Sequence, residues 1–126
     1  MHNILIRHLT GDPPAQAKRA TKFLAGEEEL LLVDLIAAEI VDVLESFYEV
    51  PRARVAELLR SVIGFPAITV VDEHVLLRAV EVYEVDRLDF AEAYLVAAAE
   101  SSGVGRIASF DRSIDRVESV VRVSPA

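Results

Sequence analysis

The chain has 126 residues, no cysteine and a formal net charge of −8, and 52% of its residues are apolar. This length suits one domain with a substantial core, and the apolar content excludes an intrinsically disordered chain. The lack of cysteine excludes disulfides and thiolate zinc sites and favours a cytoplasmic protein. No stretch predicts a membrane span or a secretory leader, so we expect no membrane partner.

The negative charge also bears on the kind of partner. A general nucleic-acid-binding protein usually carries a positive net charge. Either the partner of this chain is not nucleic acid, or some of its acids hold metal ions that reverse the local sign. Solubility alone is a third explanation, and it requires no site.

Short apolar runs alternate along the chain with longer segments of helical periodicity, and proline and glycine separate them. The runs that predict strands lie at 2–6, 29–33, 67–71, 106–110 and 120–123. The segments that predict helices lie at 14–26, 34–50, 51–64, 72–85, 89–102 and 111–117. Most of these strands are apolar without alternation, which indicates a parallel sheet covered on both faces. We therefore expect a single α/β domain over residues 1–126, a three-layer α/β/α sandwich with a mainly parallel central sheet.

Glu39 occupies an unexpected position on the helix predicted at 34–50, for which Asp34 is a plausible N-cap. At about 100° per residue, the apolar side chains of this helix form one arc. Glu39 falls inside that arc, between Leu35 and Val43, where an unsatisfied carboxylate is costly. Either Glu39 turns out to water or pairs with an arginine, or it points inward to a ligand.

The segment LDFAEAYLVAAAE at 88–100 is almost wholly apolar, yet it begins with Asp89 and Glu92. An Asp at the N-cap with a Glu three residues later is a capping box, and both acids suit the positive end of a helix dipole. The helix that follows has no polar face, which predicts a central place in the fold. Because Glu92 shares a stripe with Leu95 and Val96, we expect it to point inward, beyond what a cap requires.

Asp111 directly follows the predicted strand RIASF at 106–110. Ligands of open parallel sheets bind outside the carboxyl ends of the strands, so Asp111 is well placed for chemistry. The alternative is that it caps the short helix after it. Asp115, one turn later, is a weaker candidate and more typical of a surface residue.

These acids suggest a common chemistry if the fold brings them together. Neighbouring carboxylates repel each other unless cations lie between them, and ligand sets made only of oxygen select hard ions such as Mg²⁺ or Mn²⁺. Such ions lower the pKa of bound water and clamp phosphate oxygens during an in-line displacement. A metal site that acts on phosphate esters is therefore the leading hypothesis.

Four segments in order along the chain resemble PIN-domain ribonucleases, and specifically the toxin half of VapBC-type toxin–antitoxin pairs. The segments are NILIRHLTGDPP, IAAEIVDVLESFYEV, LDFAEAYLVAAA and ASFDRSIDRV. The resemblance implies a PIN-like fold over the whole chain. It assigns three acids of the family to Glu39, Glu92 and Asp111, with Glu92 replacing an Asp and Asp89 as the accompanying upstream acid.

The opening of the chain departs from the family pattern. An Asp and then a Thr or Ser precede the family's Asn, but these positions fall on Met1 and His2, and only Asn3 matches. We therefore expect an N-terminally shortened first strand. Two explanations remain open, a start placed downstream of the true one or a lost metal ligand. Either one predicts a weak nuclease.

The resemblance implies Mg²⁺- or Mn²⁺-dependent hydrolysis of RNA phosphodiester bonds. Glu39, Glu92 and Asp111 would hold the metal, Asp89 would orient a ligand or a second ion, and Asn3 would brace the site. The resemblance also implies a homodimer that is silenced by a VapB-type antitoxin. The amphipathic helix at 51–64 is a candidate for either contact, although packing within its own fold explains its apolar stripe equally well.

Two other functions are compatible with the sequence. The first is a PIN-like domain that no longer cleaves and serves as a protein- or RNA-binding module, which the missing Asp and the replacement at Glu92 favour. The second is a phosphoacceptor receiver domain. That class needs a strand-end lysine, whereas the lysines of this chain, Lys18 and Lys22, both fall on the first predicted helix.

Overall fold

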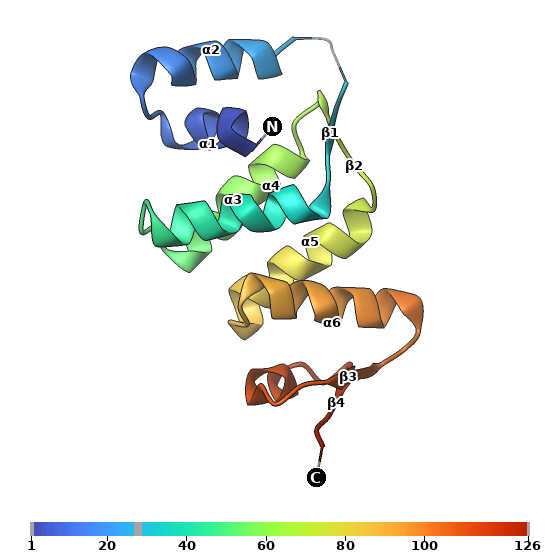
Figure 1. Ribbon diagram of the computed structural model, residues 1–126. Coiled ribbons are helices and arrows are strands. Elements are labelled where there is room, and N and C mark those ends of the chain that lie inside the picture. Colours follow the sequence, from blue (N-terminus) through green and yellow to red (C-terminus); the bar gives the residue numbers. More distant parts are fainter. Residues whose placement is uncertain (1, 27–28, 126) are drawn as a thin grey trace. The chain divides into compact units, whose positions relative to one another are not determined.

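The computed structural model describes residues 2–26 and 29–125. The chain divides into two compact units, Met1–Val71 and Asp72–Ala126, each of which is described by itself (Figure 1). Among the described residues, no helix is both long and apolar enough to cross a lipid bilayer.

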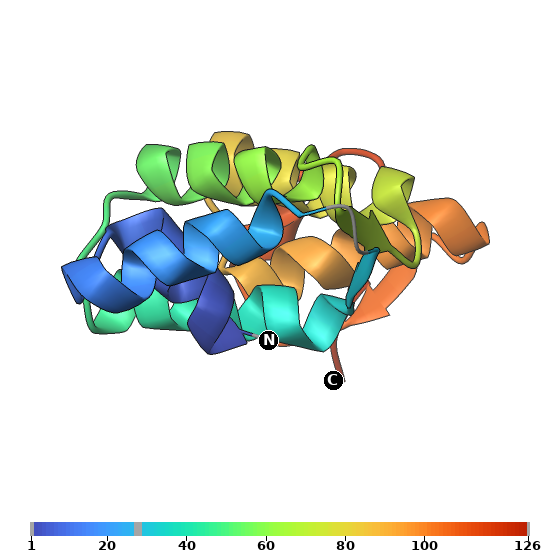
Figure 2. The same cartoon turned by 90° about the horizontal axis from the view of Figure 1, so that it is seen from above.

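The first unit contains a helical hairpin, a pair of longer helices and two short strands. Its elements are α1 (His2–Thr10), α2 (Pro14–Leu24), β1 (Leu30–Leu32), α3 (Asp34–Ser46), α4 (Arg52–Ile63) and β2 (Ile68–Val70). Helix α1 packs against both α2 and α3, and α3 packs against α4 (Figure 1, Figure 2). Strands β1 and β2 are parallel, with Leu30 opposite Ile68 and Leu32 opposite Val70.

The strand predicted at 2–6 is wrong, because these residues lie in α1. A short apolar run does not by itself distinguish a strand from a buried piece of helix. Here Leu5 and Ile6 are buried side by side in the core. The Oγ1 hydroxyl of Thr10 donates to the carbonyl of Ile6 at 2.8 Å, a contact four residues back that only a helix brings into reach.

Helix α3 presents a different face to the core from the one that the apolar arc predicts. Its buried residues are Ala37, Ile40, Val41 and Leu44, which follow the i, i+3, i+4, i+7 spacing. Leu35 is 72% exposed, although the predicted arc included it. Asp34 is the first helical residue rather than the N-cap, which is Val33.

Helix α4 begins after Pro51 and ends at Gly64, as expected. Its apolar stripe is buried within the first unit, from Val55 to Ile63. The apolar stripe of α4 therefore packs within the fold of its own chain. Its burial does not support a role for this stripe as a contact for another chain.

The second unit contains two α-helices, a π-helix, a 3₁₀-helix and two short strands. Its elements are α5 (Glu73–Glu81), the π-helix η1 (Val82–Asp86), α6 (Phe90–Ser102), β3 (Arg106–Ala108), the 3₁₀-helix η2 (Arg112–Arg116) and β4 (Val121–Val123). Helix α6 packs against α5, η1 and β3 (Figure 1). Strands β3 and β4 are parallel, with Ile107 opposite Arg122.

The fold class is mixed α/β with parallel strands, as the sequence predicts. The described strands pair as two two-stranded sheets, one in each unit. Helix α6 is central within the second unit because Phe90, Ala93, Val96, Ala97 and Ala99 are all buried. Asp89 and Glu92 lie at the amino end of this buried helix.

Candidate active site

The candidate site begins where the chain enters α6. The π-helix ends at Asp86, and Arg87 adopts a left-handed backbone conformation with φ of 61°. Leu88 is then fully buried, which fixes the path of the chain immediately before the helix. Asp89 is the N-cap of α6, and its Oδ1 accepts a hydrogen bond from the backbone N–H of Glu92 at 2.8 Å. The capping role predicted for Asp89 is confirmed.

The Glu92 side chain has an environment that a helix cap does not explain. Its side chain is half-buried, and its Oε2 atom lies out of contact with solvent without a hydrogen-bond partner. The pKa of Glu92 is raised, first by desolvation of the carboxylate and then by the negative charges of Asp89 and Asp111. A buried polar atom without a partner is costly, so a native protein that keeps one usually has a use for it.

Asp111 lies at the carboxyl end of the β3 region and is the N-cap of η2. Its Oδ1 accepts a hydrogen bond from the backbone N–H of Ser113 at 2.9 Å, and its own N–H donates to the Oγ of Ser109 at 2.9 Å. The two hydrogen bonds from Ser113 are the main reason that the pKa of Asp111 is lowered. Asp111 therefore stays ionised and acts on Glu92 as a fixed negative charge.

Arg116 connects the segments that carry the acids. Its Nη1 donates to the backbone carbonyls of Asp86 at 3.3 Å and Arg87 at 3.1 Å. Asp111 caps the first end of η2. Arg116 thereby fixes the last end of η2 to the loop that leads into Asp89. Sequence reasoning did not single out Arg116, because a backbone carbonyl some thirty residues away leaves no local pattern.

Asp115 has a structural partner. Its two carboxylate oxygens accept from Nε and Nη2 of Arg122 at 3.1 and 3.2 Å. This forked ion pair joins η2 to β4 and accounts for Asp115 without a catalytic role.

The two predicted site residues of the first unit that the structure describes, Glu39 and Asn3, are both exposed. Glu39 is exposed, so the outward orientation is the one observed of the two that the sequence left open, and its role as a metal ligand stays a prediction. The reason is that α3 turns the face carrying Ala37 and Ile40 to the core, and Glu39 lies on the other side of the helix. Asn3 lies exposed on α1, and its carbonyl accepts from Nη1 of Arg7 at 3.4 Å. Met1, where the family's first Asp would fall, is outside the described residues.

Comparison with protein-family models identifies the family of this chain. A model of the PIN domain matches residues 2–120. The chain belongs to the PIN domain family. A comparison with curated proteins found no significant match.

PIN domains are generally metal-dependent nucleases. The question is therefore whether the acids of this chain suit a divalent metal ion. Asp89, Glu92 and Asp111 offer only oxygen, which suits a hard divalent ion. The unpartnered Oε2 of Glu92 is the donor that such an ion would satisfy. Across residues 2–26 and 29–125, no three His, Asp or Glu side chains are gathered closely enough to hold a metal by themselves. Because Mg²⁺ binds through one or two carboxylates and keeps several waters, the pair Glu92 and Asp111 still fits it.

Membership of the PIN family also decides against the receiver-domain alternative. The two lysines, Lys18 and Lys22, both lie on α2, as expected, and neither follows a strand.

Proposed function

We propose that this PIN domain is a metal-dependent endoribonuclease and the toxin half of a VapBC-type pair. The observation that carries the proposal is the carboxylate of Glu92, whose Oε2 is buried without a partner while Asp89 and Asp111 add negative charge. A structural glutamate in this place would be stabilised by an arginine or a backbone donor. A glutamate held ready for a cation is the simpler explanation.

Each acid then has its own task. Glu92 and Asp111 would hold a Mg²⁺ or Mn²⁺ ion directly or through water. Asp89 positions Glu92 by accepting from its backbone N–H. When bound, the metal would polarise a phosphodiester of the substrate and lower the pKa of an attacking water. Ser113 keeps the Asp111 carboxylate ionised, which preserves its charge for this work.

The partners in this proposal are an RNA substrate, a VapB-type antitoxin and a second copy of the chain, and the place of action is the cytoplasm. Exposed apolar side chains support an interface with another chain, because Leu31 is 57% and Leu35 is 72% exposed on neighbouring elements of the first unit. A short reading frame for an antitoxin beside the gene would support the toxin assignment. If no such reading frame is present, the nuclease proposal would stand without the toxin assignment.

The test is cleavage of a structured RNA with Mg²⁺ or Mn²⁺ by the wild type, Glu92→Gln and Asp111→Asn. We expect each variant to lose at least about tenfold in rate, because ligand loss weakens the positioning of the metal. Glu73→Gln is the matched control, since Glu73 is an exposed first-turn acid of α5 as Glu92 is a first-turn acid of α6. Equal cleavage by the wild type and Glu92→Gln would reject the proposed site.

A second candidate is a PIN-like binding module that does not cleave. The observation in its favour is that no group of three ligating side chains is gathered within the described part of the chain. Isothermal titration of the wild type with Mg²⁺ and Mn²⁺ separates the two functions. Binding that depends on Glu92 supports the nuclease, whereas its absence supports the module.

A further inference from the structure

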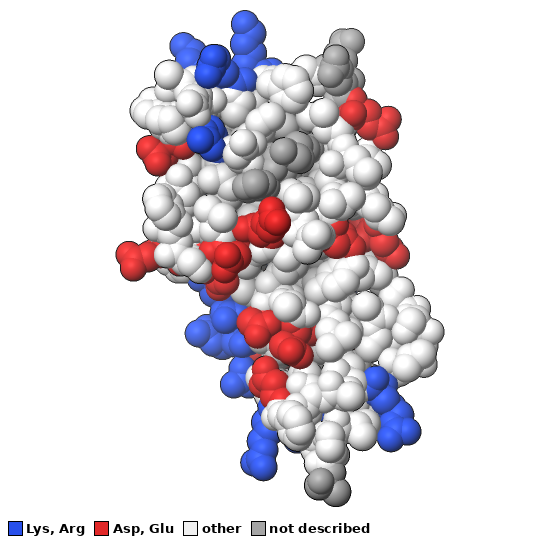
Figure 3. All heavy atoms as spheres, viewed as in Figure 1, with Lys and Arg blue, Asp and Glu red and all other residues white. Residues whose placement is uncertain are grey.

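The charge of the chain is unevenly distributed along its sequence. Residues 1–26 carry four basic side chains and one acid, a net charge of +3, whereas the remaining residues carry nine basic and twenty acidic side chains, a net charge of −11. This opening segment forms the hairpin of α1 and α2. Figure 3 shows basic side chains gathered over α2. A local positive patch on a strongly acidic protein indicates a polyanionic partner at that place.

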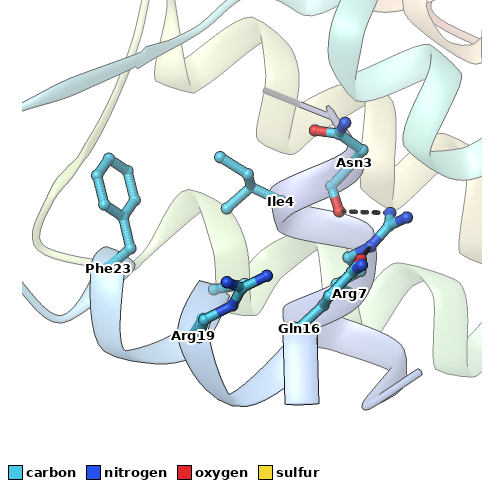
Figure 4. Close-up of a pocket in the computed structure, with 7 residues that line it drawn as sticks. Asn3, Ile4, Arg7, Gln16, Arg19 and Phe23 are labelled. Carbon is cyan, nitrogen blue, oxygen red and sulfur yellow. Dashed lines mark hydrogen bonds between the residues drawn. The ribbon is translucent and has the colours of Figure 1, made fainter. Parts of the chain in front are cut away.

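The two helices of the hairpin enclose a groove of about 380 Å³. Asn3, Ile4 and Arg7 line it from α1, and Gln16, Arg19 and Phe23 line it from α2 (Figure 4). The groove therefore combines guanidinium and amide donors with an aromatic ring. Phe23 is 49% exposed, so one face of this ring is open to a ligand.

The cations of α2 are available for a ligand. Lys18, Arg19 and Lys22 are exposed, and within the described part of the chain none of them forms an ion pair. Arg19 and Phe23 are four residues apart on α2, so both the charge and the ring border the same groove. Lys22 extends the same charged side along the helix.

The other wall of the groove is held in place by contacts within the hairpin. Arg7 donates through Nε to Oε1 of Gln16 and through Nη1 to the carbonyl of Asn3. His8 shares a hydrogen bond with the Oγ1 of Thr21 at 2.7 Å, which joins the helices a second time. The groove is thus preorganised before any ligand arrives, which lowers the entropic cost of binding.

We propose that the α1–α2 hairpin binds single-stranded RNA, with Arg19 and Lys22 on the phosphates and Phe23 stacked on a base. Cations that follow a backbone beside an exposed aromatic ring are how proteins hold single strands without reading their sequence. The inference rests on the proposed ribonuclease function for the nature of the polyanion. It adds a binding surface that contains none of the acids assigned to the metal.

The test separates binding from cleavage. Fluorescence anisotropy of a labelled oligouridine of about 12 nucleotides is measured in EDTA, between about 50 and 200 mM salt. We expect Arg19→Gln/Lys22→Gln to weaken binding by about tenfold or more at the lower salt. The slope of log affinity against log salt should become shallower by about 1.4, which is about 0.7 for each lost phosphate contact.

Variants of Phe23 test the stacking. Phe23→Leu keeps an apolar side chain but removes the ring, and we expect at least about fivefold weaker binding, whereas Phe23→Tyr should bind as the wild type does. Arg54→Gln is the control for charge, because Arg54 is an exposed arginine of α4 outside the hairpin and its loss should leave affinity unchanged. Circular dichroism melts verify that each variant is folded.

The outcomes are distinguishable from those of the nuclease test. If Glu92-dependent cleavage occurs but the Arg19→Gln/Lys22→Gln variant binds RNA as Arg54→Gln does, the hairpin inference is overturned and the nuclease stands. If no metal-dependent cleavage occurs but the Arg19, Lys22 and Phe23 variants lose RNA binding, the hairpin inference stands alone. If poly-glutamate competes with RNA as well as unlabelled oligouridine does, the surface is one for acidic protein, and the RNA inference is overturned.

Discussion

At the scale of single residues, Glu92 lies in the first turn of a helix, but burying its carboxylate without a partner costs free energy that helix capping does not offset. Asp89 caps the helix through its own side chain, which accepts from the backbone N–H of Glu92, whereas the Oε2 of Glu92 takes no part in the cap. Burial, Asp89 and Asp111 all disfavour its ionised form. The same three features make this carboxylate a strong acceptor for a cation, since binding a cation would relieve all of the repulsion at once.

The first prediction is that Glu92→Gln has opposite effects with and without metal. In EDTA at neutral pH, we expect the variant to unfold at the same temperature as the wild type or higher, because a neutral side chain avoids the desolvation and the repulsion. With Mg²⁺ at about 100 times its Kd, the wild type should gain about 2.7 kcal/mol and the variant much less. Calorimetric melts in both buffers measure the difference. If the variant is less stable than the wild type in EDTA and gains equally from Mg²⁺, Glu92 is only structural.

The second prediction uses two equivalent caps. Asp72 accepts from the N–H of Val75 at 3.1 Å at the start of α5, as Asp89 does for Glu92 at 2.8 Å in α6. Asn is as good an N-cap as Asp, so Asp72→Asn and Asp89→Asn should each change stability by less than about 0.5 kcal/mol. Only Asp89→Asn should weaken Mg²⁺ binding, by about tenfold, in isothermal titration. Equal metal affinity in the two variants would assign Asp89 to the cap alone.

At the scale of elements, the second unit depends on contacts between segments that are distant in sequence. Arg78 of α5 donates through Nε and Nη2 to the two carboxylate oxygens of Glu100 of α6, at 2.8 and 2.9 Å. The side chains are only 29% and 21% exposed, so solvent screens this pair weakly. Ser119 also donates to Glu100 and brings the segment before β4 to the same carboxylate. One acid thus holds three segments of the second unit together.

The third prediction concerns the pH dependence of this pair. The hydrogen bonds from Arg78 lower the pKa of Glu100, and they raise that of Arg78. A carboxylate with a lowered folded-state pKa adds stability above its unfolded pKa of about 4.3, and this stability is lost as the pH falls through the folded value. Glu100→Gln should therefore cost about 1–3 kcal/mol at pH 7, and the difference should shrink at acid pH. Chemical denaturation at several pH values measures it. A difference that stays constant down to acid pH would contradict the assignment.

The fourth prediction is that Arg116 positions the acids without touching the metal. Arg116→Gln removes the contacts to the carbonyls of Asp86 and Arg87, so η2 is no longer fixed to the loop before α6. We expect about tenfold weaker Mg²⁺ binding and a small loss of stability. Arg112→Gln is the matched control, because it removes one positive charge from the same short helix next to Asp111. If both variants bind Mg²⁺ alike, charge rather than positioning is responsible.

At the scale of the whole molecule, exposed apolar side chains cluster in sequence around the start of α3. Leu31, Val33 and Leu35 are 57%, 37% and 72% exposed. Apolar residues scattered singly over a surface need no explanation, but three at alternate positions of one short segment indicate an interface.

The fifth prediction is therefore that the chain forms a dimer through this segment. The wild type should sediment with twice the chain mass of 13.9 kDa at micromolar concentration. Leu35→Ser should shift it towards the monomer, whereas Val104→Ser, at a 63% exposed apolar residue of the second unit, should not. Sedimentation velocity distinguishes the two species. A wild type that is monomeric at all concentrations would show that the segment is not a self-association surface.

The sequence by itself determined the local features of this protein. Helix periodicity and proline placed α2 and α4 close to their observed limits, because the residues that favour these conformations lie within them. The caps at Asp89 and Asp111 were readable for the same reason, since a cap is a contact over two or three residues. Unalternating apolar runs predicted parallel strands, and both described strand pairs are parallel.

The tertiary structure decided everything that depends on which surface another segment covers. An apolar run as short as residues 2–6 is compatible with a strand or a helix. These residues form a helix, and in that conformation Leu5 and Ile6 are buried in the core. Glu39 is exposed because α3 buries the narrower face that contains Ala37 and Ile40, and a helical wheel does not show which apolar flank meets a partner. The pair of Arg78 and Glu100, 22 residues apart, exists only because α5 packs on α6. The local sequence pattern determines the periodicity and the ends of an element, whereas long-range packing determines its orientation. That orientation decides whether an acid is exposed to water, is paired with another group, or is buried without a partner.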